Sequence, residues 1–233
     1  MIPYKDDNPA RSVPIVTIGL IAVNAGVFLF YRLQGGCAFN AAVYELGLIP
    51  RELWSGNLPG SEGHFPPVSL VTAMFMHGGW LHLMGNMLYL WIFGDNVEDR
   101  LGRLRYLLFY LACGLIASFC HVLFNLTSRV PMVGASGAIA GVLGAYLFMF
   151  PRARVRVLVF IFIFFTTVAV PAWLMLGLWF ALQALNAWPS GGGAGGGTAY
   201  LAHVGGFVAG FAYAWRRQRR RGPAGGYGSW SYK

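Results

Sequence analysis

Charged side chains are scarce in this sequence. Only 11% of its 233 residues are Asp, Glu, Lys or Arg, and just 8 of these are acidic, whereas 57% of the chain is hydrophobic and 16% aromatic. These values lie far from those of soluble globular domains. The composition therefore excludes an ordinary soluble protein and predicts a polytopic membrane protein.

Cysteine is also rare, with only Cys37, Cys113 and Cys120. Three cysteines at these positions match neither a disulfide framework nor the spacing of metal ligands. Cys113 and Cys120 stand seven residues apart in an apolar run, where we expect them to pack as small hydrophobic side chains. The sequence thus predicts no metal and no small-molecule cofactor.

The net charge of +9 would suggest nucleic-acid binding in a soluble protein. Here the basic residues stand in short clusters between apolar runs, where they act as topology signals, so nucleic acid is not an expected partner. Fourteen of the 17 Lys and Arg residues fall on one side of the alternating connections. The positive-inside rule then places both termini in the cytoplasm and the segments 34–67, 126–132 and 187–198 outside.

Six apolar runs are long enough to cross the roughly 30 Å hydrocarbon core of a bilayer. They cover residues 12–33, 68–93, 104–125, 133–150, 156–186 and 199–215. The predicted fold class is an all-α membrane protein, a polytopic bundle of six transmembrane helices. Its parts are a cytoplasmic N-terminal segment (1–11), the six-helix domain (12–215) and a basic, disordered cytoplasmic tail on the lipid surface (216–233).

Ser136 stands in a run of small residues, Gly134 to Gly141, at the start of an apolar helix. Small neighbours expose its hydroxyl and the nearby backbone N–H groups, as a nucleophile requires. The same residues also form a ridge along Gly137, Gly141 and Ala145 that suits close helix packing, which is the simpler explanation of the pattern. The catalytic interpretation therefore needs a base and an oxyanion site elsewhere in the chain.

Polar side chains inside a membrane span are costly and are functional candidates by default. In the second apolar run, the i, i+4 spacing puts His82 and Asn86 on one helix face, where they could also serve only as interhelical hydrogen-bond partners. His77 points elsewhere and is interpreted as a histidine that anchors a loop. The carboxylates Glu98 and Asp99 are interpreted as ion-pair partners at a helix end.

The sixth run carries His203 beside a second small-residue ridge, Ala202, Gly206 and Gly210. If this ridge packs on that of Ser136, the two side chains meet at one depth and His203 can act as the base. His82, Asn86 and the Ser136 backbone N–H would then stabilise an oxyanion. Because no acidic third member is evident, the chemistry would be that of a Ser-His dyad.

These residues resemble the rhomboid family of intramembrane serine proteases, in its bacterial, six-helix form. The resemblance covers residues 12–215 and keeps the order of the family's motifs. The matching motifs are Gly134-Ala135-Ser136-Gly137, Ala202-His203-x2-Gly206-x3-Gly210, His77-x4-His82-x3-Asn86 and Gly94-x3-Glu98-x-Arg100-Leu101-Gly102.

The resemblance implies Ser136 as nucleophile, His203 as its base and His82 and Asn86 in the oxyanion site. It also implies hydrolysis of single-span membrane proteins in or near their transmembrane segment, with those substrates and the lipid bilayer as partners. The location implied is a bacterial inner membrane, with multiple spans. Ala140 stands where many members carry a Tyr that packs against the catalytic histidine, so His203 has to be oriented by other contacts.

Two other functions stay open at the level of sequence. A catalytically inactive rhomboid-like protein could bind or escort membrane proteins, although such proteins lose the residues that correspond to Ser136 or His203. A transporter or channel built on the polar second helix is less compatible, because the chain shows no internal repeat.

Two further segments invite expectations. The outward segment 34–67 either lies in the membrane interface or forms a loose loop over the helix ends. The glycine-rich stretch Gly191–Gly197 and Pro171, inside the expected span 156–186, together form a candidate gate for substrates, or else a passive connector and a fixed bend.

Overall fold

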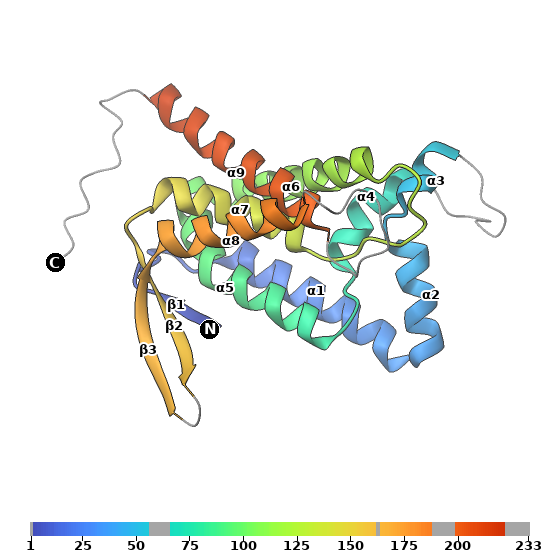
Figure 1. Ribbon diagram of the computed structural model, residues 1–233, viewed down its shortest axis with the longest axis horizontal. Helices are drawn as coiled ribbons and strands as arrows, with labels where there is room; N and C mark the ends of the chain where they lie inside the picture. The colour runs from blue at the N-terminus through green and yellow to red at the C-terminus, as the bar shows by residue number, and fades with distance from the viewer. Residues whose placement is uncertain (1, 56–65, 162–163, 188–198, 222–233) are drawn as a thin grey trace.

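The structure is a computed structural model, which describes residues 2–55, 66–161, 164–187 and 199–221. Most of these residues lie in helices, and the long helices pack side by side (Figure 1). The long helices and the strands are β1 Ile2–Asp6, α1 Ile15–Leu33, α5 Trp80–Leu101, α6 Arg103–Phe124, α7 Ser136–Met149, β2 Arg154–Ile161, β3 Phe164–Pro171, α8 Ala172–Ala187 and α9 Tyr200–Arg221. The shorter helices are α2 Gly36–Leu46, α3 Pro50–Ser55, η1 Pro66–Val68, α4 Ser69–Thr72 and η2 Ala73–Phe75. The helical character that was predicted is confirmed, but the expectation of an all-α protein is wrong.

Two of the helices in the described ranges, α1 and α6, are both long enough and apolar enough to cross a membrane. The apolar helices α7 and α8 are shorter than 18 residues. The presence of six transmembrane spans therefore stays a prediction.

The expected span over residues 156–186 is wrong. Its first part forms the hairpin of β2 and β3, in which Arg154 pairs with Pro171 and Ile161 with Phe164, and only its second part, α8, is helical. The reason is local: polar and β-branched residues alternate along Arg154–Val157, which favours a strand, and a proline disfavours a helix that runs through residue 171. Pro171 ends β3, so a proline bend inside a span is excluded, and Gly191–Gly197 lie outside the described residues.

The expected span over residues 68–93 is also interrupted. The chain passes through α4 and η2, becomes extended at Met76, and starts the long helix only at Trp80, after Gly78 and Gly79. The apolar residues before this break serve packing, since Met74 and Met76 are buried. His82 and Asn86 thus lie in the first two turns of α5.

The outward segment 34–67 is structured where it is described, because it contains α2 and α3. Phe39 of α2 packs against Phe28 of α1, and Leu48 pairs through its backbone with Met132. A loose loop is therefore wrong for residues 34–55, while a position in the membrane interface stays a prediction.

The strands and the Arg-rich end of α9 gather at one end of the bundle, opposite α2 and α3 (Figure 1). β1 pairs with β2, and Asp6 at its end is buried, where it accepts hydrogen bonds from Tyr146 of α7 and Asn96 of α5. Burial raises the pKa of Asp6 to about 7. The described helix α9 continues to Arg221, six residues past the expected boundary of the domain at 215.

Glu98 caps a neighbouring helix, a role beyond the helix-end ion pair that was expected. Its buried carboxylate accepts hydrogen bonds from the backbone N–H groups of Val16 and Thr17 and from the Thr17 hydroxyl, at 2.8 to 3.0 Å. Unpaired N–H groups at a helix start favour a negative charge. Asp99 accepts a bond from Ser12 just before α1. These contacts join the end of α5 to the start of α1.

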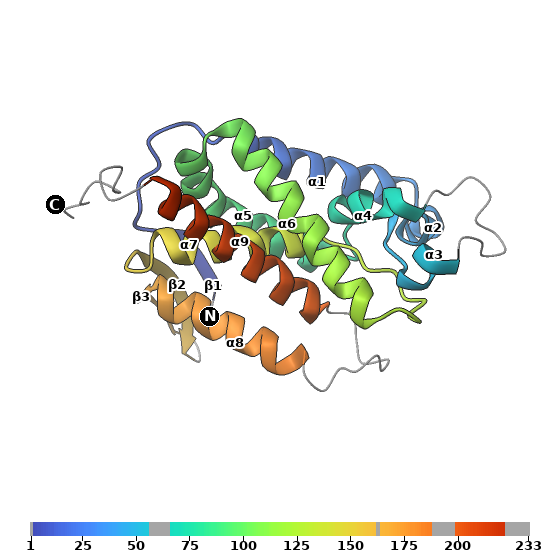
Figure 2. The same ribbon diagram turned by 90° about the horizontal axis from the view of Figure 1, so that it is seen from above.

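The tightest helix contact is that between α7 and α9, which the two small-residue ridges predicted. Figure 2 shows α9 between α6 and α8, along α7. A methyl group added at Gly206 would collide with the backbone carbonyl of Gly137, and one at Gly210 with that of Gly141. Cys113 and Cys120 of α6 pack against Gly141 and Gly205, as small hydrophobic side chains. The prediction that the two ridges face each other is confirmed.

We expect Gly206→Leu to lower the unfolding temperature of the detergent-solubilised protein and to abolish the reaction of Ser136 with a serine-directed probe, because leucine would force α7 and α9 apart. A displacement of about 1 Å near reacting groups costs on the order of 10²-fold in rate. Gly177→Leu in α8 is the matched control, since nothing lies within 4 Å of the Cβ it would add. Wild-type stability and activity in Gly206→Leu would contradict the packing.

Candidate active site

Ser136 is the first residue of α7, and a backbone hydrogen bond holds the loop before it in place. Gly134 donates its N–H to the Ala73 carbonyl at 2.8 Å and has a φ of 130°, a conformation that L side chains rarely adopt. The first N–H groups of a helix have no acceptor in the helix itself. At Ser136 these groups stand beside the hydroxyl, so they are able to bind a negative charge.

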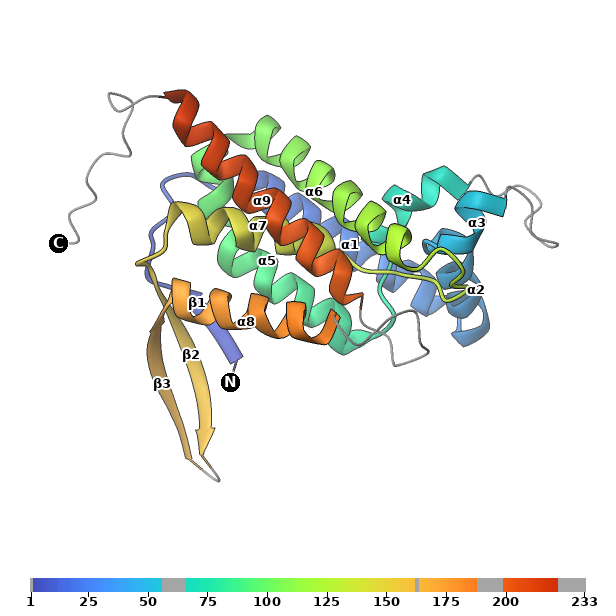
Figure 3. The same ribbon diagram turned by 45° about the horizontal axis from the view of Figure 1, so that its top comes forward.

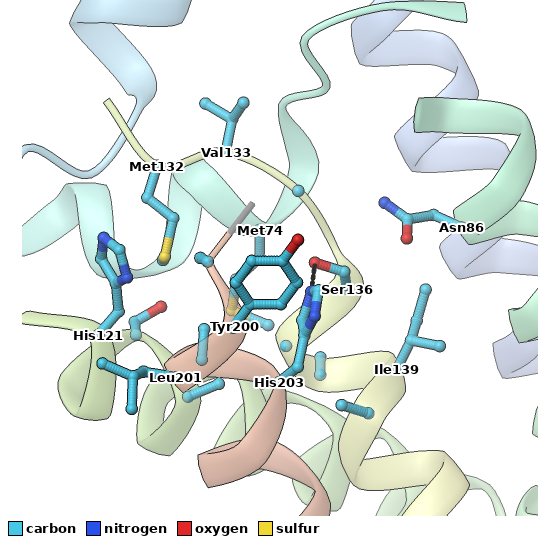
Figure 4. A pocket seen from close by; sticks show the side chains of 18 of the residues that line it. Met74, Asn86, His121, Met132, Val133, Ser136, Ile139, Tyr200, Leu201 and His203 are labelled. Atoms are coloured by element: carbon cyan, nitrogen blue, oxygen red, sulfur yellow. Dashed lines mark hydrogen bonds between the residues drawn. The ribbon is translucent and has the colours of Figure 1, made fainter. Parts of the chain in front are cut away.

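His203 lies against this hydroxyl from α9. Its Nε2 is 2.8 Å from Ser136 Oγ, as the dashed line in Figure 4 marks. The His203 side chain is buried, whereas Ser136 is half-buried at the cavity wall. The two predicted residues are therefore brought together at hydrogen-bond distance, by the close packing of α7 on α9.

His82 and Asn86 approach the same place from α5. A Cβ atom on Gly134 would lie 2.8 Å from His82 Nε2 and 3.6 Å from Asn86 Nδ2, so both side chains flank the loop that leads to Ser136. Figure 4 shows the Asn86 side chain reaching from α5 into the cavity. Asn86 is buried, and its Nδ2 has no hydrogen-bond partner in the described part of the chain. A buried donor without a partner at a cavity wall is available to a ligand that enters the cavity.

A cavity of about 900 Å³ surrounds these four side chains. Its walls come from α5, α6, α7, α8 and α9 and from the loop before α7. Within the described residues, no group of three or more His, Cys, Asp or Glu side chains is arranged to hold a metal ion. The cavity combines a hydroxyl, imidazoles and an amide with apolar walls, a composition typical of sites that bind and orient an organic substrate.

Sequence reasoning missed two residues of this cavity, Trp179 and Gln183 of α8. Gln183 Oε1 lies 2.8 Å from His203 Nδ1, and the Trp179 ring lies 5.8 Å from the His203 ring, tilted by 35°. The signal was available, because a glutamine in an apolar run is as unusual as the polar pair of the second span. These contacts orient His203 in place of the ring that Ala140 cannot supply.

His77 does not join the site directly. It is fully buried in the turn before α5, and its ring meets that of His82 edge to face at 5.2 Å. Neither of its ring nitrogens has a hydrogen-bond partner among the described residues. The contact supports the His82 ring from behind. His77 therefore points toward His82 and not elsewhere as expected, and its role in anchoring a loop stays a prediction.

The arrangement suits nucleophilic catalysis on a carbonyl group. A hydroxyl within 2.8 Å of an imidazole nitrogen can lose its proton as it attacks. Unpaired backbone N–H groups and the Asn86 amide lie on the other side of that hydroxyl, where the oxyanion of a tetrahedral intermediate would form. The chemistry indicated is acyl transfer.

Comparison with known proteins agrees with this geometry. The family model of the rhomboid domain matches residues 65–220. The chain is 33% identical over 214 residues to "Rhomboid protein 1, mitochondrial" of Saccharomyces cerevisiae, an alignment that covers 84% of this chain and 58% of the yeast protein. It is 31% identical over 198 residues to "Rhomboid protease GluP" of Bacillus subtilis, covering 85% of this chain and 34% of that protein. The chain thus spans only about a third to three fifths of the length of these relatives.

We expect Gly134→Ala to suppress reaction of Ser136 with a serine-directed phosphonate probe by at least about 10²-fold, because the new methyl group would displace the His82 ring. Gly35→Ala is the control: Gly35 also has a positive φ, of 96°, but nothing lies within 4 Å of the added Cβ. The free energy of unfolding of both variants should fall by about 1–3 kcal/mol because of backbone strain. Only Gly134→Ala should also lose its reactivity with the probe. Intact mass spectrometry measures the labelling, and equal reactivity of the two variants would contradict this prediction.

Proposed function

The chain belongs to the rhomboid family, and on that premise we propose that it is a serine endopeptidase that cleaves single-span membrane proteins in or near their transmembrane segment. The observation that carries the proposal is the 2.8 Å separation between Ser136 Oγ and His203 Nε2 beside a cavity enclosed by helices. A proteolytic role also agrees with the name of the Bacillus relative.

In the proposed reaction, Ser136 Oγ attacks the carbonyl carbon of the scissile peptide bond while His203 Nε2 takes the hydroxyl proton. The tetrahedral intermediate collapses when the C–N bond breaks and His203 gives that proton to the leaving amine. Water then attacks the acyl-enzyme by the same steps in reverse order, which releases the second product and restores Ser136. No other reactant is required.

The oxyanion of the intermediate would be stabilised by the Ser136 backbone N–H, Asn86 and His82. Support comes from the buried, unpartnered Nδ2 of Asn86 and from the position of both side chains against Gly134. A donor that is already fixed in a water-poor site needs no reorganisation when charge develops. The apolar cavity walls strengthen each of these bonds, because the effective dielectric constant is low there.

Membrane topology follows from charge in this proposal. The end of the bundle that holds the strands and the Arg-rich end of α9 faces the cytoplasm. The cavity is lined by the start of α9 and the loop before α7, which lie at the other end of α9. We retain six spans as the working topology. Since the relatives include a mitochondrial and a bacterial protein, the bacterial inner membrane stays a prediction.

The deciding test uses Ser136→Ala and His203→Ala with a purified single-span test substrate in proteoliposomes. We expect both variants to lose cleavage almost completely and to keep the wild-type unfolding temperature, because a nucleophile and its base act as a unit. Intact mass should show a serine-directed probe on the wild type only. Labelling that persists in Ser136→Ala would refute the assignment of Ser136 as the nucleophile.

Asn86→Ala and His82→Ala should each lower kcat by about 10²- to 10³-fold, the usual cost of removing one oxyanion donor, and leave KM nearly unchanged. Kinetics on the same substrate provide the measurement, and thermal unfolding provides the control. If the loss of activity tracked the loss of stability in both variants, these residues would be interhelical hydrogen-bond partners only.

The alternative function is that of an inactive, rhomboid-like binding or escort factor. The sequence keeps both Ser136 and His203, which disfavours it. Wild-type protein that retained a membrane client in a pull-down but neither cleaved it nor reacted with the probe would support this alternative.

A further inference from the structure

Both ring nitrogens of His203 are engaged, and they are engaged by different helices. Nε2 faces Ser136 Oγ of α7, and Nδ1 faces Gln183 Oε1 of α8, each at 2.8 Å. Among the described residues, no carboxylate forms a hydrogen bond with His203, so the place that an aspartate takes in a Ser-His-Asp triad is taken by an amide.

The carbonyl oxygen of an amide can only accept a hydrogen bond. With Oε1 against Nδ1, the ring proton of neutral His203 must sit on Nδ1, and Nε2 keeps a free lone pair directed at the Ser136 hydroxyl. In the other tautomer Nε2 already carries the proton, so this nitrogen has no free lone pair with which to accept the proton of the Ser136 hydroxyl. We infer that Gln183 is a positioning residue that holds His203 as the Nδ1–H tautomer, so that Ser136, His203 and Gln183 form a hydrogen-bonded triad in which the proton moves only between Ser136 and His203.

This inference rests on the proposed protease function and adds a third member to its dyad. The Trp179 ring, one helical turn before Gln183, restrains the tilt of the imidazole, while Gln183 fixes which edge faces serine. Ala140 is fully buried and has no ring to stack on His203, so the described orienting contacts come from α8.

A neutral partner suits this location. A carboxylate at this position would stand at the partly apolar cavity wall beside the buried His203, where a charge is less well solvated than in water. The glutamine carbonyl supplies the same direction without that charge. Its dipole also favours the imidazolium that forms while Ser136 attacks, since the oxygen remains 2.8 Å from the protonated edge.

The test compares Gln183→Met, which is similar in size but has no strong acceptor, with Gln183→Glu, which keeps an acceptor oxygen. Leu182→Met is the matched control on α8, because Leu182 is the adjacent residue and is half-exposed. We expect Gln183→Met to lower both kcat and the rate of Ser136 labelling by about 10- to 10²-fold with KM within about twofold, since a displaced base costs rate rather than binding. Gln183→Glu should restore most of the lost rate, and Leu182→Met should match the wild type.

The tautomer itself can be observed by ¹⁵N NMR of histidine-labelled protein, with the His203 signals assigned by their loss in His203→Gln. We expect the wild type to show a protonated Nδ1 and an unprotonated Nε2, and Gln183→Met to show a mixture of both tautomers. An unchanged tautomer together with wild-type labelling in Gln183→Met would overturn the inference. A wild-type protein that showed the expected tautomer but never reacted at Ser136 would instead overturn the proposed function.

Discussion

The close approach of α7 and α9 is the contact on which the site depends. Gly137 and Gly141 on one helix meet Gly206 and Gly210 on the other, so backbone lies against backbone with no side chain between them. Lipid tails are as apolar as leucine, so packing of this kind, rather than water exclusion, holds membrane helices together. The shape of two glycine-rich surfaces therefore determines whether Ser136 and His203 stand at hydrogen-bond distance.

The polar groups inside the bundle follow one physical rule, that a buried polar atom needs a partner. Glu98 satisfies it by capping α1, Asp6 by accepting from Tyr146 and Asn96, and His203 by bonding at both ring nitrogens. Asn86 Nδ2 and both ring nitrogens of His77 depart from the rule, because they lack partners among the described residues. Of these atoms, Asn86 Nδ2 lies at the cavity wall, where a substrate oxygen would be able to accept its hydrogen bond.

Sequence and structure agree better on the positions of the candidate site residues than on the fold, whereas the catalytic roles of these residues stay predictions. Ser136, His82, Asn86 and His203 were found because local spacing puts them on helix faces beside small residues, and the structure brings them together. The span over residues 156–186 was mispredicted because average hydropathy does not distinguish a helix from an apolar hairpin, although the alternation from Arg154 to Val157 carried that information. Gln183 is recognisable in the sequence as a polar residue in an apolar run, but the sequence did not show that its partner is His203, 20 residues away, because only tertiary packing joins them.

Few residues of helix α8 are buried, and contacts at both ends and along its middle fix its position. In the middle, Leu176 is fully buried and the Phe180 ring stacks on that of Phe207 in α9 at 4.5 Å. At its start, Ala172 and Trp173 donate backbone hydrogen bonds to the carbonyls of Ala153 and Pro151, directly after the hairpin that extends from the bundle in Figure 3. Near its other end, Gln183 meets His203. A shift of α8 away from α9 would break that contact and free the imidazole to adopt the unproductive tautomer. In the proposed site, the position of α8 is therefore coupled to the orientation of His203 through the Gln183 hydrogen bond and the Trp179 ring contact.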